Sequence, residues 1–277
     1  MEYNRVLTIQ DISCVGQCSM TVALPIVSAC GQETCILPSS VLSTHTMGFS
    51  FPQIRDLTED FPAFAAHWEK ENISFDAMYT GYLGSTQQVG YVVEIFDRFL
   101  RKGGKTVVDP AMADHGKLYP AFDMEYVAAM IELVRRAQVV VPNLTEACLL
   151  TGCQYREDYD EAYILQVVEK LHGLGVPYVV LTGVGYEAGK TGVLLSTPQG
   201  VDYYCHPRLD KNFHGTGDVY ASAFVGSWLS GKTIHQAIRI AADYTCRCME
   251  NTMDDESHWY GVKFETALPY LIEQLQS

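Results

Sequence analysis

The sequence lacks any concentration of positive charge. It has 19 lysines and arginines against 33 aspartates and glutamates, which gives a net charge of −14 at pH 7. Proteins that bind nucleic acid neutralise phosphates with clustered basic side chains. No stretch of this chain gathers lysine and arginine in that way, so we expect neither DNA nor RNA as a partner.

Long apolar runs are also missing. Runs such as Val139–Val141 are far shorter than the roughly 20 residues that cross a bilayer as a helix. The first residues, Met1–Arg5, lead at once into a strand-like run, without the basic and apolar segments of a secretory leader. These features predict a cytoplasmic protein that has no membrane partner.

The sequence shows no disulfide framework, no low-complexity linker and no internal repeat. Its nine cysteines are an odd number scattered along the chain, so we expect reduced thiols that mostly pack in the interior. Cys14 and Cys18 are interpreted in the same way, although they lie near a candidate site. We expect a single domain that covers residues 1–277.

Short β-branched runs alternate with longer stretches of helical period. The predicted strands cover residues 6–9, 35–37, 77–79, 106–108, 139–141, 178–181 and 192–195, and the predicted helices cover residues 19–30, 85–101, 123–136, 160–174, 219–230, 234–249 and 264–274. The strand runs are apolar throughout rather than alternating, which indicates helices on both faces of a mostly parallel sheet. The sequence therefore predicts a three-layer α/β/α sandwich.

Ligands of such sheets bind outside the carboxyl ends of the strands. This rule selects the polar residues and glycines that follow the predicted strands, namely Asp11, Gly81, Tyr82, Asp109, Asn143, Thr182 and Gly183.

Residues 226–233 match the phosphate-loop pattern G-x-x-x-x-G-K-[ST], but their context differs from that of a phosphate loop. Such a loop follows a strand and opens a helix, whereas residues 219–230 have the apolar spacing of a helix. Gly231 stands where a helix C-cap belongs, and a new amphipathic stripe begins at Ile234. We interpret the segment as helix, turn, helix; a P-loop ATPase centred on Lys232 is the alternative.

A stronger signal lies in Phe213–Asp218, directly before the helix predicted from Val219. The amides of Gly215, Thr216 and Gly217 at a helix N-terminus would form a small anion hole. Asp218 beside it could accept a hydroxyl proton as the oxygen attacks phosphorus. The alternative is a helix cap preceded by a glycine turn.

Five segments in order resemble the ribokinase superfamily and, within it, the pyridoxal kinases. Residues 215–218 match the superfamily's G-[TAV]-G-D signature, and residues 143–146 match its N-x-x-E element. Residues 43–46 are similar to the pyridoxal kinase S-x-H-T loop, residues 80–85 to G-Y-L-G-S, and residues 107–119 to the D-P-V-M-G-D…Y stretch. The likeness extends over nearly the whole chain.

The resemblance implies transfer of the γ-phosphoryl group of ATP to the 5′-hydroxymethyl group of pyridoxal, pyridoxine or pyridoxamine. It implies the following roles: Asp218 as general base, with Gly215, Thr216 and Gly217 as the anion hole; Asp109 and Glu146 around Mg²⁺, directly or through water; Asp114, Tyr119, Asn143, Glu146, Thr182, Gly183, Thr216 and Gly217 toward ATP; and His45, Thr46 and Tyr82 around the pyridine ring. It also implies a homodimer and a supporting monovalent cation, usually K⁺.

Each of these roles has an alternative that needs no ligand. Asn143 and Glu146 could form a helix N-cap pair, Asp109 could end a strand, and Tyr82 and His45 could be structural.

Two positions depart from the pattern. Asp11 stands where pyridoxal kinases commonly have serine, and its carboxylate could pair with a protonated pyridine nitrogen or favour a cationic amine. The preferred vitamer is therefore left open. His214 replaces the cysteine of a related branch of vitamin-precursor kinases, which disfavours that branch.

The remaining hypotheses are a sugar or hydroxymethylpyrimidine kinase on the same scaffold, and a vitamin-binding protein without turnover. Residues 113–122 and 206–213 are the candidate closing loops.

Overall fold

The computed structural model describes residues 3–209, 211 and 213–276. The helices in this part of the chain are α1 (Met20–Ala29), α2 (Phe61–Lys70), α3 (Thr86–Phe99), α4 (Met124–Val134), α5 (Leu144–Thr151), α6 (Glu161–His172), α7 (Thr216–Leu229), α8 (Ile234–Glu250) and α9 (Leu268–Gln276). The strands are β1 (Arg5–Ser13), β2 (Glu33–Leu42), β3 (Ile54–Asp56), β4 (Phe75–Thr80), β5 (Leu100–Val108), β6 (Ala113–Asp114), β7 (Lys117–Leu118), β8 (Val139–Val140), β9 (Tyr178–Val184), β10 (Lys190–Thr197) and β11 (Gly200–Pro207). Two short 3₁₀ helices, η1 (Thr58–Asp60) and η2 (Phe264–Ala267), precede α2 and α9.

The centre of the fold is a nine-stranded sheet in the order β11-β10-β9-β8-β5-β4-β1-β2-β3. Its six middle strands, from β9 to β2, are parallel, and β10, β11 and β3 run antiparallel to their neighbours. β6 and β7 form a separate small hairpin.

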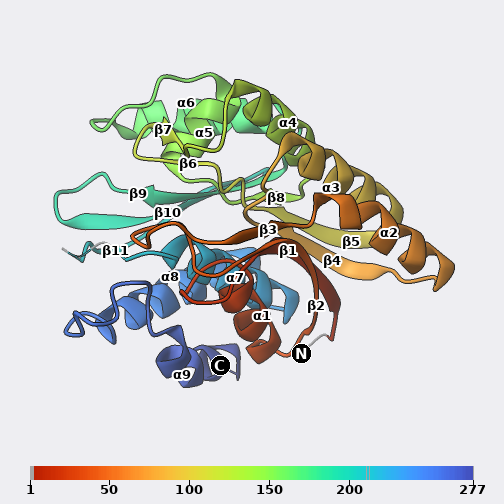
Figure 1. Cartoon of the computed structure of the whole chain (residues 1–277). Helices are drawn as coiled ribbons and strands as arrows, with labels where there is room; N and C mark the ends of the chain where they lie inside the picture. The colour runs from red at the N-terminus through yellow and green to blue at the C-terminus, as the bar shows by residue number, and fades with distance from the viewer. Residues whose placement is uncertain (1–2, 210, 212, 277) are drawn as a thin grey trace.

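Helices cover both faces of this sheet, as Figure 1 shows. The helices α2 to α6 pack on one face around one buried apolar cluster, and α1, α7, α8 and α9 pack on the other around a second cluster. Strand residues such as Leu7 and Val6 alternate between the two clusters, so the middle strands are buried on both sides. The predicted three-layer α/β/α sandwich with a mostly parallel sheet is confirmed.

Local signals start several helices. Side-chain oxygens of Ser85, Asp123 and Asp160 accept backbone N–H groups at the starts of α3, α4 and α6. Thr233 and Gln236 form a capping box at α8, and Gly231 has a φ of +101°. The predicted helix, turn, helix over residues 226–233 is therefore confirmed, and Lys232 lies beyond the C-terminal end of α7.

Other boundaries differ from the prediction. The helix predicted to begin at Val219 begins at Thr216, so that the glycine-containing segment is its first turn. The last predicted helix divides into η2 and α9. The strands β3 and β11 and the helices α2 and α5 were not predicted. Two of these elements lack a one-sided apolar pattern: β3 is exposed at all three residues, and α5 is buried almost all round.

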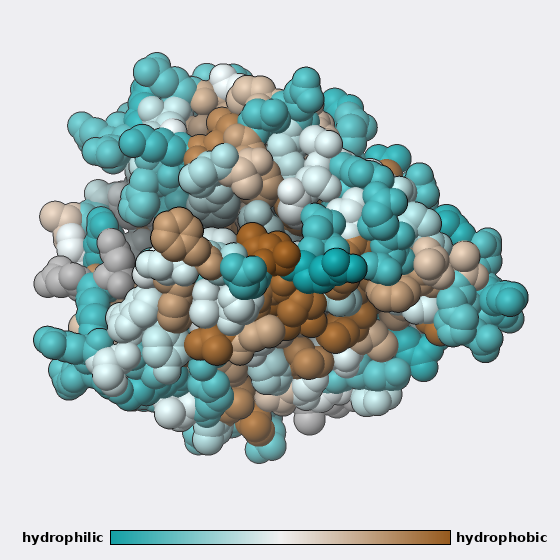
Figure 2. Space-filling view, in the orientation of Figure 1, coloured by the Kyte–Doolittle hydropathy of each residue, from teal (hydrophilic) through white to brown (hydrophobic). Residues whose placement is uncertain are grey.

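The surface carries an apolar area. Figure 2 shows apolar side chains gathered across the middle of the face where α1 and the β1–β2–β3 edge lie; Leu24, Ile36 and Ile54 of these elements are exposed. No helix in the described part of the chain is long and apolar enough to span a bilayer. All nine cysteines are free thiols.

Candidate active site

The N-terminus of α7 carries the strongest sequence motif. Gly215 is the residue before the helix, with a φ of +75°, and a Cβ there would collide with the carbonyl oxygen of Gln17. The Val219 amide bonds to the Gly215 carbonyl at 3.0 Å, so the amides of the first turn precede the intrahelical hydrogen bonds and have no helical acceptor. At Gly217 no atom lies within 4 Å of where a Cβ would stand. This open, amide-lined helix end can receive an anion.

Asp218 belongs to the same first turn and keeps partial solvent access. Burial is the main cause that raises the pKa of its carboxyl to about 7; a hydrogen bond from the Ser19 backbone amide opposes this rise, and the negative charge of Asp11 adds to it. A carboxyl group with a pKa near 7 gains and loses a proton readily at neutral pH. Asp218 is therefore suited to take a proton from an alcohol.

Two more buried carboxyl groups belong to this region: Asp109 lies near Asp218, and Glu146 lies near Asp109. Asp109 follows β5, and burial together with the negative charges of Glu146 and Asp218 raises its pKa well above the usual range. Its Oδ1 accepts the Ala111 amide at 3.1 Å. Burial likewise raises the pKa of Glu146 to about 7, although three backbone amides oppose the rise. Such mutual repulsion is relieved when a cation binds.

These carboxylates fit a magnesium ion in different ways. The Glu146 Oε1 accepts the Met112 amide at 3.1 Å, and Oε2 accepts the Asn143 amide at 2.9 Å. Because both of its oxygens accept amides, Glu146 is suited to hold Mg²⁺ through water. Asp109, which uses one oxygen for the Ala111 amide, has the other available for direct contact. The described residues contain no group of three His, Cys, Asp or Glu placed to hold a metal.

Asn143 and Glu146 form a helix N-cap pair, which was the structural alternative to their predicted ligand roles. Asn143 Oδ1 accepts the Glu146 amide at 3.0 Å, and the Glu146 side chain accepts the Asn143 amide, which completes a capping box at α5. Asn143 Nδ2 also donates to the Ala113 carbonyl at 2.8 Å. The pair thus ties the β6–β7 hairpin to the start of α5.

The other predicted nucleotide residues lie at the ends of neighbouring elements. Thr182 pairs with Asn143 in an isolated bridge, and its amide donates to the Pro142 carbonyl at 2.9 Å. Gly183 has a φ of +72° with open space around it. Asp114 is exposed, whereas burial and the charge of Glu146 raise the pKa of the Tyr119 hydroxyl. The structure brings these residues to the same edge of the sheet as Glu146.

The predicted acceptor residues lie around the end of β1. Asp11 is 5% exposed and accepts the Ser13 hydroxyl at 3.0 Å; burial raises its pKa, and hydrogen bonds from the Ser19 and Ser13 side chains oppose the rise. Tyr82 is half-buried against Phe122, with ring centroids 5.4 Å apart. His45 is buried, and Thr46 beside it is exposed. Phe122 ends one of the two candidate closing loops; the other, residues 206–213, includes Asp210 and Asn212, which lie outside the described residues.

Two groups of residues near the site were not predicted from the sequence. Tyr79 on β4 is fully buried, its hydroxyl makes no hydrogen bond within the described residues, and the charges of Asp109 and Asp218 add to the burial that raises its pKa. Residues 258–261 contact the loop that holds His45. Tyr79 reads as an ordinary apolar strand residue, and residues 258–261 belong to no regular element, so sequence periodicity gives no signal for either.

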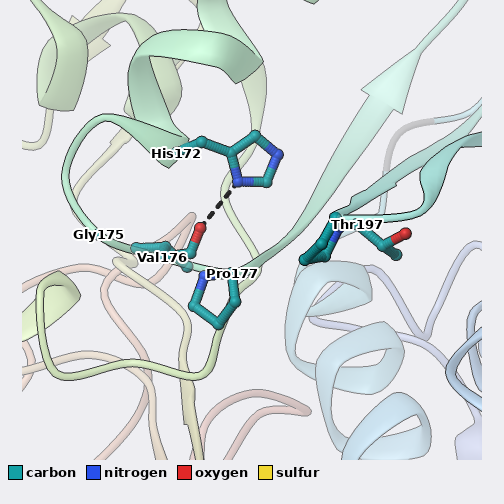
Figure 3. A pocket seen from close by; sticks show the side chains of 6 residues that line it. His172, Gly175, Val176, Pro177 and Thr197 are labelled. Carbon is teal, nitrogen blue, oxygen red and sulfur yellow. Dashed lines mark hydrogen bonds between the residues drawn. The ribbon is translucent and has the colours of Figure 1, made fainter.

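A surface pocket of about 360 Å³ lies elsewhere in the molecule. It is lined by residues 175–177, which precede β9, and by Thr197 at the end of β10. Figure 3 shows His172 at its edge, with Nδ1 bonded to the Val176 carbonyl at 2.8 Å. The pocket lies at the amino end of β9, whereas the residues described above follow the carboxyl ends of the parallel strands. The pocket is therefore separate from the candidate active site.

Comparisons with known proteins agree with this geometry. The family model described as phosphomethylpyrimidine kinase matches residues 35–262. A hydroxymethylpyrimidine/phosphomethylpyrimidine kinase of Bacillus subtilis is 29% identical over 187 residues, which are 66% of each chain. The matches to the first curated relatives span about half to two thirds of the length of those proteins.

Solved structures match along nearly the whole chain. A pyridoxal kinase of Lactobacillus plantarum has a TM-score of 0.91 and 31% identity, covering 98% of this chain and 97% of that one. A candidate phosphomethylpyrimidine kinase of Bacteroides thetaiotaomicron, in a crystal form with pyridoxal, has a TM-score of 0.91 and 34% identity, covering 96% and 95%. The resemblance to pyridoxal kinases is thus confirmed at the level of the superfamily. The chain belongs to the phosphomethylpyrimidine kinase family of ATP-dependent phosphotransferases, which has the ribokinase-like fold.

Proposed function

We propose that this protein phosphorylates the 5′-hydroxymethyl group of a B6 vitamer, pyridoxal, pyridoxine or pyridoxamine, with ATP as the donor. The observation that carries the proposal is Asp218, a carboxyl group with a pKa of about 7 in the first turn of α7, beside the open amides of Thr216 and Gly217. A base next to an anion hole is the arrangement that phosphoryl transfer to an alcohol requires.

The reaction follows from the positions of these groups. Asp218 accepts the proton of the hydroxymethyl group while the hydroxymethyl oxygen forms a bond to the γ-phosphorus of ATP. The bond from that phosphorus to the bridging oxygen breaks, and ADP leaves. The amides of Gly215, Thr216 and Gly217 stabilise the charge on the transferred group. Asp109, directly, and Glu146, through water, would hold Mg²⁺, which when bound would neutralise phosphate charge.

The remaining predicted residues divide between the two substrates. Asn143, Asp114, Tyr119, Thr182 and Gly183 line the nucleotide side, and Asp11, Tyr82 and the loop with His45 and Thr46 line the acceptor side. Asp11 is buried at the acceptor side, where its carboxylate can pair with the protonated pyridine nitrogen. A K⁺ requirement, a homodimer and a cytoplasmic location stay predictions.

A hydroxymethylpyrimidine kinase is the second candidate. The family model and the Bacillus subtilis relative favour it, because both are named for pyrimidine substrates. The B6 vitamer is preferred because His214 occupies the position of the cysteine found in the related branch, and because a structure 34% identical to this chain was crystallised with pyridoxal.

Acceptor-dependent ADP release tests both candidates. The assay contains Mg-ATP, K⁺ and one acceptor at a time: pyridoxal, pyridoxine, pyridoxamine, hydroxymethylpyrimidine or ribose. We expect turnover of a B6 vitamer that falls by a factor of roughly 10³ or more in Asp218→Asn, because the base is lost. The variant Asp254→Asn, which changes an exposed carboxylate, is the matched control.

Other outcomes choose between the alternatives. Turnover of the pyrimidine alone supports the second candidate, and turnover of ribose alone supports a sugar kinase. Binding of a vitamer without ADP release by either the unmodified chain or Asp218→Asn contradicts the kinase proposal and favours a vitamin-binding protein.

A further inference from the structure

His45 lies at a junction of three segments that are far apart in the sequence. The segments are the β1–α1 loop with Gly16 and Gln17, the loop of residues 43–49, and residues 258–261. The His45 ring is 3% exposed, and its centroid lies 5.7 Å from that of His214, directly before the anion hole. The junction therefore adjoins the acceptor side of the site.

Both ring nitrogens of His45 have partners within the protein. Nε2 lies 2.9 Å from the Tyr260 carbonyl oxygen, and the Met47 amide donates to Nδ1 at 3.2 Å. A carbonyl can only accept and an amide N–H can only donate, so Nε2 must carry the proton and Nδ1 must be the acceptor. The hydrogen bonds therefore specify the neutral tautomer protonated at Nε2.

The same carbonyl also binds the first segment, because the Gln17 amide donates to the Tyr260 oxygen at 3.4 Å. One backbone oxygen thus receives the β1–α1 loop and the His45 loop together. The Gln17 carbonyl in turn packs so closely on Gly215 that a Cβ there would collide with it. The start of α7, with Asp218, is consequently connected to residues 258–261 through Gln17.

Close packing holds the junction on its other sides. A Cβ at Gly16 would collide with the His45 ring, and one at Gly48 would lie 2.7 Å from Trp259. The Phe49 ring fills the space between His45 and Trp259, with centroids 4.9 Å and 4.6 Å away. The three segments are therefore closely packed against one another, and moving any of them away would break these contacts.

We propose that His45 is a positioning residue, which fastens the 43–49 loop to residues 258–261 and does not bind the acceptor through its ring nitrogens. Residues 258–261 then form the outer support of the acceptor site, and the direct contacts from this loop fall to its exposed members such as Thr46. The reference to an acceptor rests on the proposed function, whereas the tautomer and the fastening are properties of the protein alone.

The ring nitrogens test the proposal directly. We would label the protein with ¹⁵N-histidine, record the ring nitrogens at pH 8, and assign His45 by its absence in His45→Gln. We expect the tautomer protonated at Nε2, and no change of either nitrogen when pyridoxine and a non-hydrolysable ATP analogue are added. A ring protonated at Nδ1, or ring nitrogens that shift on addition of pyridoxine, overturns the proposal.

Hydrogen exchange and kinetics test the fastening. In His45→Phe, amide exchange should accelerate in residues 43–49 and in residues 258–261 together, and His45→Gln, which keeps a donor, should restore protection in both. The KM for the acceptor should rise about tenfold in His45→Phe with kcat and the KM for ATP unchanged, as expected when one hydrogen bond that preorganises a site is lost.

Two comparisons separate the possible failures. His67→Phe changes an exposed histidine on α2 and should leave exchange and KM unaltered. Exchange that accelerates in the 43–49 loop alone overturns the fastening. If no vitamer or pyrimidine is phosphorylated, the proposed function fails, but the tautomer and the exchange measurements still decide the role of His45.

Discussion

Asp218 is subject to opposing effects on one carboxyl group. Burial and the neighbouring Asp11 favour its protonated form, and the Ser19 amide favours its charged form, with a resulting pKa of about 7. A base must be deprotonated to act, so activity should be limited by this group in mildly acidic solution.

The pH dependence of kcat/KM should show this limit. We expect kcat/KM for the acceptor to rise with pH up to about 7 and to level off above it, because the fraction of deprotonated Asp218 increases over that range. In Asp11→Asn the rise should move to lower pH, since a negative charge that raises the Asp218 pKa is removed. A steady-state pH profile of both proteins is the measurement. The control Asp254→Asn should have the same pH profile as the unmodified chain. If the rise in kcat/KM occurred at the same pH in Asp11→Asn, the effect of the Asp11 charge on the Asp218 pKa would be contradicted.

The same pKa has a consequence for stability. A carboxyl group whose pKa is higher in the folded than in the unfolded chain stabilises the fold at low pH, and this stabilisation is lost as the pH rises through the folded-state value of about 7. Asp218→Asn should therefore raise the free energy of unfolding at pH 8 by about 1–3 kcal/mol, and by less at pH 6. Urea denaturation at the two pH values checks this. If Asp218→Asn raised the free energy of unfolding equally at pH 6 and pH 8, the effect would come from packing and not from charge.

At the scale of elements, the start of α7 contains two glycines with different requirements. Gly215 has a φ of +75° and no room for a Cβ, whereas Gly217 faces open space. Gly215→Ala should lower Tm by several degrees through strain and collision with Gln17, at a cost of about 1–3 kcal/mol. Gly217→Ala should keep or slightly raise Tm, because alanine favours helix, but should strongly reduce kcat/KM by placing a methyl group in the anion hole.

Thermal melts and ADP release on the two alanine variants provide the comparison. The pair is matched, since both substitutions add one methyl group within the same turn. Full activity in Gly217→Ala with a normal Tm would show that the phosphoryl group does not approach this helix end.

An element can be predicted from the sequence when its own apolar pattern determines it, and not when tertiary packing does. The middle strands and the helices α3, α4, α6 and α8 were predicted because burial on one or both faces determines their apolar pattern. The start of α7 was placed three residues late, because two glycines in Gly215–Asp218 suggest a turn while tertiary packing continues the helix through them.

The candidate site divides in the same way. Asp218, Asp109, Glu146 and Asn143 were identified because they follow strands or lie in short motifs. The role of His45 depends on the Tyr260 carbonyl, which lies 215 residues away and is a backbone atom. No pattern of side chains in the sequence encodes such a contact, so the supporting segment could be found in the structure alone.

At the scale of the whole molecule, the strand order concentrates negative charge. The neighbouring strands β8, β5, β4 and β1 end side by side, and their carboxyl edge together with α7 collects Asp11, Asp109, Glu146 and Asp218. Burial, together with the negative charges of Glu146 and Asp218, raises the pKa of Asp109 well above its usual range in a chain whose net charge is −14. The parallel topology that creates the site therefore also destabilises the protein at neutral pH.

A divalent cation should relieve this repulsion. We expect millimolar Mg²⁺ to raise Tm by roughly 2–5 °C at pH 7.5, the shift that binding of one ion to the folded chain produces when its concentration is several times Kd. Asp109→Asn should raise Tm without metal, because one buried charge is removed, and should lose most of the response to Mg²⁺. The measurement is a thermal melt of each protein with Mg²⁺ or with NaCl at equal ionic strength.

NaCl should have a smaller effect, because it screens charge without occupying the site. Asp254→Asn should respond to Mg²⁺ as the unmodified chain does, since its exposed carboxylate lies outside the cluster. An equal response in Asp109→Asn would mean that the ion binds elsewhere, and the assignment of Asp109 as the residue that contacts the metal would then be wrong.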